Sequence, residues 1–139
     1  MKLENIEKKI YMIKEYIGII DELKPDCLKR IRTDKIYRGS VLYYLYILSD
    51  SCISLAEMVI KHESLPKPQT YFEAIDMLGE HNIIPSDFAF EFAKITGLRN
   101  FLAHDYEKVD YEEICKLMIE KIDDINKYLF FIEKHLNKS

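Results

Sequence analysis

The sequence predicts an all-α protein, on three observations. Glycine and proline number only four each in 139 residues, and Leu, Ile, Lys and Glu dominate, a composition that favours helices over strands. Apolar residues recur at steps of three and four along most of the chain, which is the period of an amphipathic helix. Two of these stretches follow an acceptor side chain with a glutamate three residues further on, a helix-start signature. We expect one domain over residues 1–139, an antiparallel bundle of four long helices with one additional short helix.

Apolar spacing and a proline define the first two helices. Residues 3–23 carry one apolar stripe, formed by Leu3, Ile6, Ile10, Ile13, Ile17 and Ile20. Pro25 ends this pattern, and a longer helix is predicted over residues 33–62. Within it, residues 41–47 have the aromatic content of a strand. The helical spacing continues to Val59 without a turn signal, so one long and largely buried helix is expected.

A loop and a short helix come next. Residues 64–69 contain two prolines and are a predicted loop. Thr70 and Glu73 have the spacing of a capping box. In this motif the threonine side chain accepts a hydrogen bond from the backbone N–H of the glutamate, and the glutamate side chain accepts one from the backbone N–H of the cap residue. The short helix opened by this box is predicted to run through Leu78 and Gly79.

Two further helix starts complete the pattern. Pro85 and Ser86 begin a helix, and Asp110 with Glu113 repeats the cap spacing at the start of the last helix. The buried stripe of that last helix is expected at Ile114, Leu117, Met118, Ile122, Ile125, Leu129, Ile132 and Leu136.

The helix that begins at Ser86 has two apolar faces. At about 100° per residue, one face carries Phe88, Phe92, Ile95, Arg99 and Leu102. The other carries Phe90, Gly97 and Phe101, and Ala93 and Gly97 leave room there for a second backbone. One face can pack in the bundle while the other meets a partner subunit, so we expect a homodimer with this helix at or near the interface.

Cysteine usage and the absence of a signal core favour a reducing compartment. Cys27, Cys52 and Cys115 are odd in number, far apart and set among apolar neighbours, so neither a disulfide framework nor a metal site is expected. The N-terminus is charged, and the longest purely apolar run, residues 41–48, is too short to span a bilayer. We therefore expect a cytoplasmic protein that does not bind a membrane.

The net charge and the spacing of the histidines argue against a general nucleic-acid-binding surface and against a metal site. The formal net charge is -4, which argues against a general nucleic-acid coat. His62, His81 and His135 have no second ligand at metal spacing, so no metal and no cofactor are expected. Lys35 and Arg38, near the start of the second helix, are interpreted as solvated charges in preference to RNA contacts. The tyrosines that follow are interpreted as packed aromatics in preference to residues that stack on bases: Tyr43, Tyr44 and Tyr46.

The segment Arg99-Asn-Phe-Leu-Ala-His104-Asp-Tyr106 carries the candidate chemistry. A guanidinium holds phosphate, and an imidazole that titrates near neutrality moves a proton, which are the minimum needed to transesterify RNA without a metal. Arg99 and His104 are five residues apart, so an unbroken helix would rotate them about 140° from each other.

Several geometries remain open at this point. Either the helix ends near Ala103 and turns His104 back, or Arg99 of one chain serves the site of another. Tyr106 would align with Arg99 if the helix persisted. A purely structural interpretation has Arg99 and His104 binding the last carbonyls of the helix. The strongly apolar helix that they close, and the charge balance from the acidic residues around them, argue against that interpretation.

On these residues the sequence resembles the HEPN superfamily, whose signature is an arginine, four to six residues, a histidine, one residue and often a tyrosine. More narrowly it is similar to the HepT toxins of HEPN/MNT toxin–antitoxin pairs. The resemblance extends from the long second helix to the last one, through the two-proline loop and the phrases Thr70-Tyr-Phe-Glu-Ala, Ile83-Ile-Pro85, Gly97-Leu-Arg99-Asn and Val109-Asp110.

The resemblance implies a homodimeric, metal-independent endoribonuclease toxin. In family terms Arg99 would bind the scissile phosphate, and His104 would take the 2′-hydroxyl proton, leaving a cyclic phosphate. The partners would be RNA and an MNT-type nucleotidyltransferase antitoxin, which would transfer AMP to Tyr106. The alternative is a non-catalytic HEPN module that binds a nucleotide or a protein.

The resemblance also implies an acidic residue on the second helix, at about Ser54. Here Asp50 lies one turn before that position and Glu57 one turn after it. These three residues, together with Asn100 beside Arg99, are the predicted supporting residues of the site.

Overall fold

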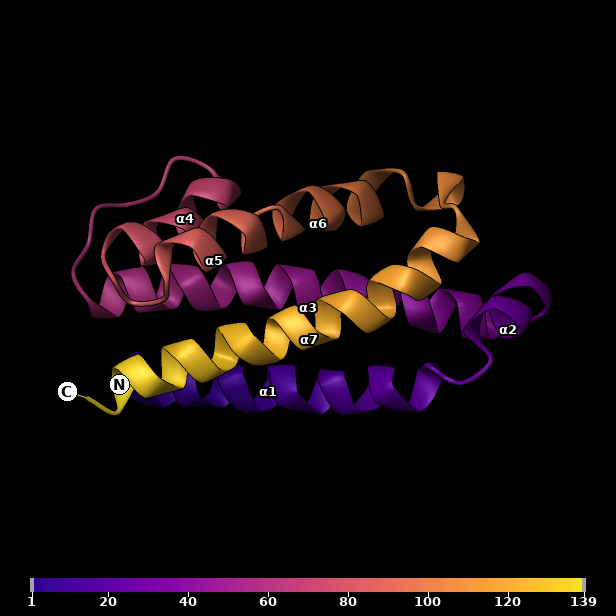
Figure 1. The fold of residues 1–139 in the computed structure, drawn as a ribbon, viewed down its shortest axis with the longest axis horizontal. Coiled ribbons are helices and arrows are strands. Elements are labelled where there is room, and N and C mark those ends of the chain that lie inside the picture. Colours follow the sequence, from indigo (N-terminus) through magenta and orange to yellow (C-terminus); the bar gives the residue numbers. More distant parts are fainter. Residues whose placement is uncertain (1, 139) are drawn as a thin grey trace.

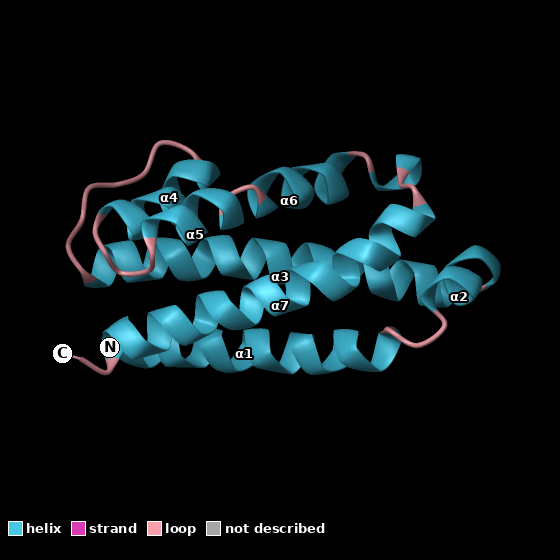
Figure 2. Cartoon of the chain, in the orientation of Figure 1, coloured by secondary structure: helices cyan, strands magenta, loops and turns pink. Residues whose placement is uncertain are grey.

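Helices form all the regular structure among the residues that the computed structural model describes, which are 2–138 with the side chains of Lys2 and Tyr106 left out (Figure 2). The all-α prediction is therefore confirmed for this part of the chain. In chain order the elements are α1 (Lys2–Leu23), α2 (Cys27–Thr33), α3 (Lys35–His62), α4 (Tyr71–Glu80), α5 (Ser86–Phe92), α6 (Ile95–His104), the 3₁₀ turn η1 (Tyr106–Lys108) and α7 (Tyr111–Leu136).

Three long helices form the body of the molecule (Figure 1). α3 packs against α1 on one side and against α4 and α6 on the other, while α7 crosses over α1. α2 lies at one end of the bundle, where it contacts α3 and α7. The helices pack together because each buries an apolar stripe. Burying one large aliphatic side chain stabilises the fold by about 1.5–3 kcal/mol.

α3 is the core helix. Its buried side chains run from Tyr37 to Ile60. By length and composition it is the one described helix that could cross a membrane, but 56% of the relevant stretch is buried inside the bundle. Such burial is what a central helix of a globular bundle requires.

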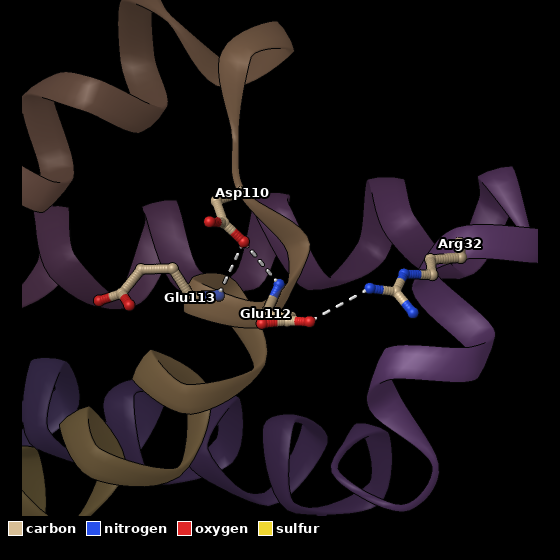
Figure 3. A network of polar contacts seen from close by, with 4 residues as sticks. All are labelled: Arg32, Asp110, Glu112 and Glu113. Atoms are coloured by element: carbon tan, nitrogen blue, oxygen red, sulfur yellow. Dashed lines mark hydrogen bonds and ion pairs between the residues drawn. The ribbon is translucent and has the colours of Figure 1, made fainter.

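Both predicted caps are present. The Thr70 hydroxyl accepts from the Glu73 backbone N–H at 3.0 Å, and the Glu73 carboxylate accepts from the backbone N–H of Gln69. Asp110 accepts from the backbone N–H groups of Glu112 and Glu113 at the start of α7 (Figure 3). The bonds from the amides of Glu73, Glu112 and Glu113 satisfy donors that would otherwise lack partners in the first helical turn.

The predicted helix from Ser86 onward is broken into α5 and α6, which corrects the prediction of a fourth long helix. At the junction the backbone N–H groups of Thr96 and Gly97 bond three residues back, to the carbonyls of Ala93 and Lys94. The Thr96 hydroxyl also binds the Ala93 carbonyl, at 2.8 Å. A tightened turn of this kind changes the helix direction without a proline.

The segment after Pro25 is also more ordered than predicted, because it forms the helix α2. Asp26 takes the left-handed conformation (φ 56°) that Asp and Asn tolerate better than other residues, and the chain turns there into α2. At the other end of α2, Arg32 pairs with Glu112 of α7 at 3.4 Å (Figure 3). This ion pair and the packing of the two helices place α2 against the start of α7.

A disulfide joins Cys27 of α2 to Cys115 of α7, so the prediction that all three cysteines are unbonded is wrong. Cys52 is the free and fully buried cysteine, and burial raises the pKa of its thiol. Sequence spacing did not reveal the bond because the two partners are 88 positions apart. They meet through α2, which the sequence pattern did not predict.

Breaking this disulfide lowers the stability of the fold. A cross-link restricts the unfolded chain, and closing a long loop stabilises a protein by about 2–4 kcal/mol. We expect dithiothreitol or Cys115→Ser to lower the urea midpoint accordingly. Dithiothreitol has no further effect on Cys115→Ser, which is the control. An unchanged midpoint of the reduced parent protein contradicts the expectation.

Candidate functional site

Arg99 of α6 lies over α3 and is held there by Asp50. Its Nε donates to Oδ1 of Asp50 at 3.0 Å. The side chains are 17% and 35% exposed, so the pair is partly shielded from water. The packing of α6 on α3 positions both residues. The supporting role predicted for Asp50 is therefore consistent with a direct contact between its carboxylate and Arg99.

Two aromatic rings flank the same guanidinium. Cζ of Arg99 lies 5.5 Å from the centre of the Tyr46 ring, on α3, and 5.0 Å from that of Tyr71, at the start of α4. Cation–π attraction acts over such distances. The hydrogen bond to Asp50 is the main cause that raises the pKa of Arg99, against burial, which lowers it. The guanidinium therefore stays charged and has a fixed orientation.

Part of the guanidinium remains available to a ligand. An arginine has five N–H donors. One on Nε binds Asp50, and one on Nη1 binds Oδ1 of Asn100 at 3.2 Å. The other donors, including both on Nη2, make no hydrogen bond within the described part of the chain. A planar, charged donor group of this kind binds the oxygens of a phosphate or a carboxylate.

His104 is the last residue of α6, and its side chain is exposed. Among the described residues, its ring makes no hydrogen bond or ion pair. α6 ends at His104, close to the predicted end near Ala103. The backbone N–H of Asp105 still bonds to the Phe101 carbonyl, so the last turn is helical and His104 is not turned back towards Arg99. The two side chains leave the helix about 140° apart. One copy of α6 does not aim them at the same atom.

The remaining predicted residues fall in different places. Ser54 is half-buried and Glu57 exposed on α3, and both line a cavity of about 520 Å³ near Pro68, where neither contacts Arg99. The carboxylate implied at position 54 is supplied one turn earlier, by Asp50. The side chain of Tyr106 lies outside the described part. Since α6 ends at His104, the helical alignment of Tyr106 with Arg99 is absent.

Tyr46 and Tyr71 are site residues that the sequence interpretation missed. Tyr46 lies one turn before Asp50 on the same face of α3, so its spacing was a usable signal. Tyr71 directly follows the Thr70 cap, and nothing in its local pattern connects it with α6. Within the described residues, no group of three or more His, Cys, Asp or Glu side chains is arranged to hold a metal ion.

The family model described as "Ribonuclease HepT-like" matches residues 13–132. The chain is 24% identical over 128 residues to an mRNA nuclease HepT of Shewanella oneidensis, covering 92% of this chain and 96% of that protein. It is 28% identical over 135 residues to a putative RNase of Archaeoglobus fulgidus, covering 96% and 92%.

One solved structure has the same fold. It is the tri-AMPylated HEPN toxin of Shewanella oneidensis in complex with an MNT antitoxin. The TM-score is 0.83 at 24% identity, over 93% of this chain and 96% of that one. At this identity the likeness establishes the fold alone.

Proposed function

The chain belongs to the ribonuclease HepT-like family, and from this premise we propose that it is a metal-independent endoribonuclease toxin of a toxin–antitoxin pair. The observation that carries the proposal is the fixed guanidinium of Arg99, which keeps free donors on the same helix that ends with the exposed His104. The activity of the relatives named as an mRNA nuclease and a putative RNase supports it. We place this activity in the cytoplasm because cellular RNA is found there; with the Cys27–Cys115 disulfide, the cysteines no longer support that compartment.

The proposed reaction is an internal transesterification of RNA. Arg99 binds the non-bridging oxygens of the scissile phosphate and stabilises the charge that grows there. His104 removes the proton from the 2′-hydroxyl, and O2′ forms a bond to phosphorus while the bond to O5′ breaks. The O5′ leaving group takes up a proton. The products are a 2′,3′-cyclic phosphate end and a 5′-hydroxyl end, and no metal enters the step.

We propose that each site is composed from two copies of the chain. Arg99 and His104 leave α6 about 140° apart, so a phosphate bound by Arg99 meets the histidine of a partner subunit more easily than that of its own chain. The surface near α6 has room and apolar area for this contact. Phe90 is 52% exposed, and a Cβ added at Gly97 would meet nothing within 4 Å.

The proposed inhibitor is an MNT-type nucleotidyltransferase antitoxin. The structural relative described as tri-AMPylated and bound to an MNT antitoxin supports this partner. Tyr106, two residues after His104, is the proposed acceptor of AMP. Nucleotides attached there would place phosphate charge beside the site and compete with RNA for Arg99.

Asp50 acts in this proposal as a positioning residue. Asp50→Ala frees the guanidinium to rotate, and misplacement of a catalytic group by about 1 Å can lower a rate about 100-fold. We expect kcat to fall by that order. KM should not rise, because the substitution also removes a negative charge near the RNA backbone. Glu22→Ala, which removes an exposed carboxylate on α1 far from Arg99, should leave both constants unchanged. A rise in KM at constant kcat would contradict the positioning role.

The test of the function is cleavage of total cellular RNA by the purified protein in EDTA, with the product ends mapped. Cyclic phosphate ends that are absent with His104→Ala establish the proposed chemistry. If protein shown by its intact mass to carry no AMP does not cleave RNA, the non-catalytic HEPN module is the better description.

A further inference from the structure

A cavity of about 580 Å³ lies beside the arginine–histidine motif and takes no part in the function described so far. The first half of α3 forms one wall, from Lys35 to Tyr46. Leu102 of α6, together with η1 and the start of α7, forms the other. Cavities that hold small organic ligands have volumes of about 300–1,000 Å³, so a single nucleotide fits this one by size.

One end of the cavity is cationic and rigid. Lys35 is exposed there, and Arg38 is held by two hydrogen bonds, from Nε to the carbonyl of Ile31 at 2.9 Å and from Nη2 to that of Arg32 at 3.3 Å. The guanidinium also lies 4.9 Å from the centre of the Tyr111 ring. Nη1 makes no hydrogen bond within the described residues. Such an end suits a phosphate group.

The other part of the cavity is aromatic and open. Tyr43 is 54% exposed, and its ring is held edge-on by Tyr44 with their centres 5.1 Å apart. Tyr46 lines the same wall. A Cβ added at Gly39 would meet nothing within 4 Å, so the missing side chain leaves space in the cavity. Glu107 also lines it and offers an acceptor for the amino group of a base.

Tyr46 connects this cavity to the site. Its ring lines the cavity and also lies 5.5 Å from Cζ of Arg99. Tyr43, Tyr46 and Asp50 follow one another at steps of three and four, which puts them on one face of α3. A chain of nucleotides that places a phosphate at Arg99 therefore has its neighbouring unit within reach of the cavity.

We infer that this cavity binds RNA next to the scissile phosphate, with a base against Tyr43 and Tyr46 and a phosphate further along the same strand near Lys35 and Arg38. The inference rests on the proposed ribonuclease function and adds a substrate-binding subsite to it. Stacking on exposed aromatic rings combined with nearby cations is the usual way in which proteins bind single-stranded RNA.

The first experiment measures binding without cleavage. The protein contains no tryptophan, so Tyr43→Trp introduces a single tryptophan, placed in the cavity, whose emission can be followed separately from that of the tyrosines. The probe is a 2′-O-methyl tetraribonucleotide, whose blocked hydroxyl prevents the reaction. We expect saturable quenching for Tyr43→Trp and none for Tyr11→Trp, a variant of an exposed tyrosine on α1. In the Tyr43→Trp background, Lys35→Ala should weaken binding about tenfold, since a charged hydrogen bond is lost.

Two smaller probes test whether the cavity binds RNA, a single nucleotide or only a phosphate group. AMP and ribose 5-phosphate are titrated alongside the tetranucleotide. We expect AMP to bind more weakly than the tetranucleotide, and ribose 5-phosphate more weakly still. Equal binding of AMP and the tetranucleotide would identify a mononucleotide site and overturn the RNA subsite. Equal binding of ribose 5-phosphate would reduce the cavity to an anion site and overturn the inference as well.

A filling substitution tests the cavity in the otherwise unchanged protein. Gly39→Leu places a side chain in the open space, and leucine forms helix better than glycine, so the fold is retained. We expect KM for RNA to rise about tenfold or more. Gly18→Leu is the matched control, because Gly18 is also an exposed helical glycine with nothing within 4 Å of an added Cβ.

The outcomes distinguish the inference from the function on which it rests. Cleavage by the parent protein, combined with no quenching of Tyr43→Trp or no effect of Gly39→Leu, overturns the subsite and leaves the ribonuclease proposal intact. Quenching that responds to Lys35→Ala in a protein that cleaves no RNA keeps the nucleotide-binding cavity and overturns the ribonuclease proposal.

Discussion

His104→Ala lowers the rate of RNA cleavage by about 10²–10⁴-fold, the usual contribution of a general base. The thermal stability of the protein should stay the same, because the side chain is exposed and makes no hydrogen bond among the described residues. The measurement is kcat on a short fluorescent RNA, with the melting temperature of each protein recorded by circular dichroism. Loss of cleavage without loss of stability separates a chemical role from a structural one.

The control for this result is His81→Ala. His81 is also an exposed histidine that follows the end of a helix, in this case α4. It lies outside the motif, so kcat should not change. If both histidine variants cleave RNA at the parent rate, the proton transfer is not performed by His104, and the proposed mechanism is wrong.

Mixing Arg99→Ala chains with His104→Ala chains restores cleavage, although each variant alone retains at most a small fraction of the parent rate. In a site composed across a dimer, a mixed dimer has one site with both substitutions and one site with neither. Half of the dimers are mixed after random exchange, so about a quarter of the parent activity should return. We expect this result because the side chains of Arg99 and His104 leave one copy of α6 about 140° apart.

The exchange itself is verified by native mass spectrometry. Mixed dimers that remain inactive would show that each site lies within one chain. A protein that stays monomeric would contradict the homodimer as well. Two separately prepared samples of Arg99→Ala, mixed in the same way, give the background rate.

Local sequence patterns predicted a large part of this structure. The caps at Thr70 and Asp110 were predictable because a cap needs only the residues within one helical turn. The span of α3 was predictable because its apolar spacing continues without a break from Val41 to Val59. The family resemblance likewise rested on short phrases in a fixed order, and the family match over residues 13–132 confirms it.

The tertiary structure alone decided the features that join distant segments. The Cys27–Cys115 disulfide depends on how α2 docks against α7. Arg99 binds Asp50, and not Ser54 or Glu57, because of the position along α3 at which α6 packs against it.

The break between α5 and α6 had a weak local signal, a threonine that bonds back to Ala93. The cavity beside Tyr43 had none, because its walls come from α3, α6, η1 and α7. Contacts within one turn are encoded by neighbouring residues. Contacts between helices depend on the relative placement of whole elements, which the packing of the core determines.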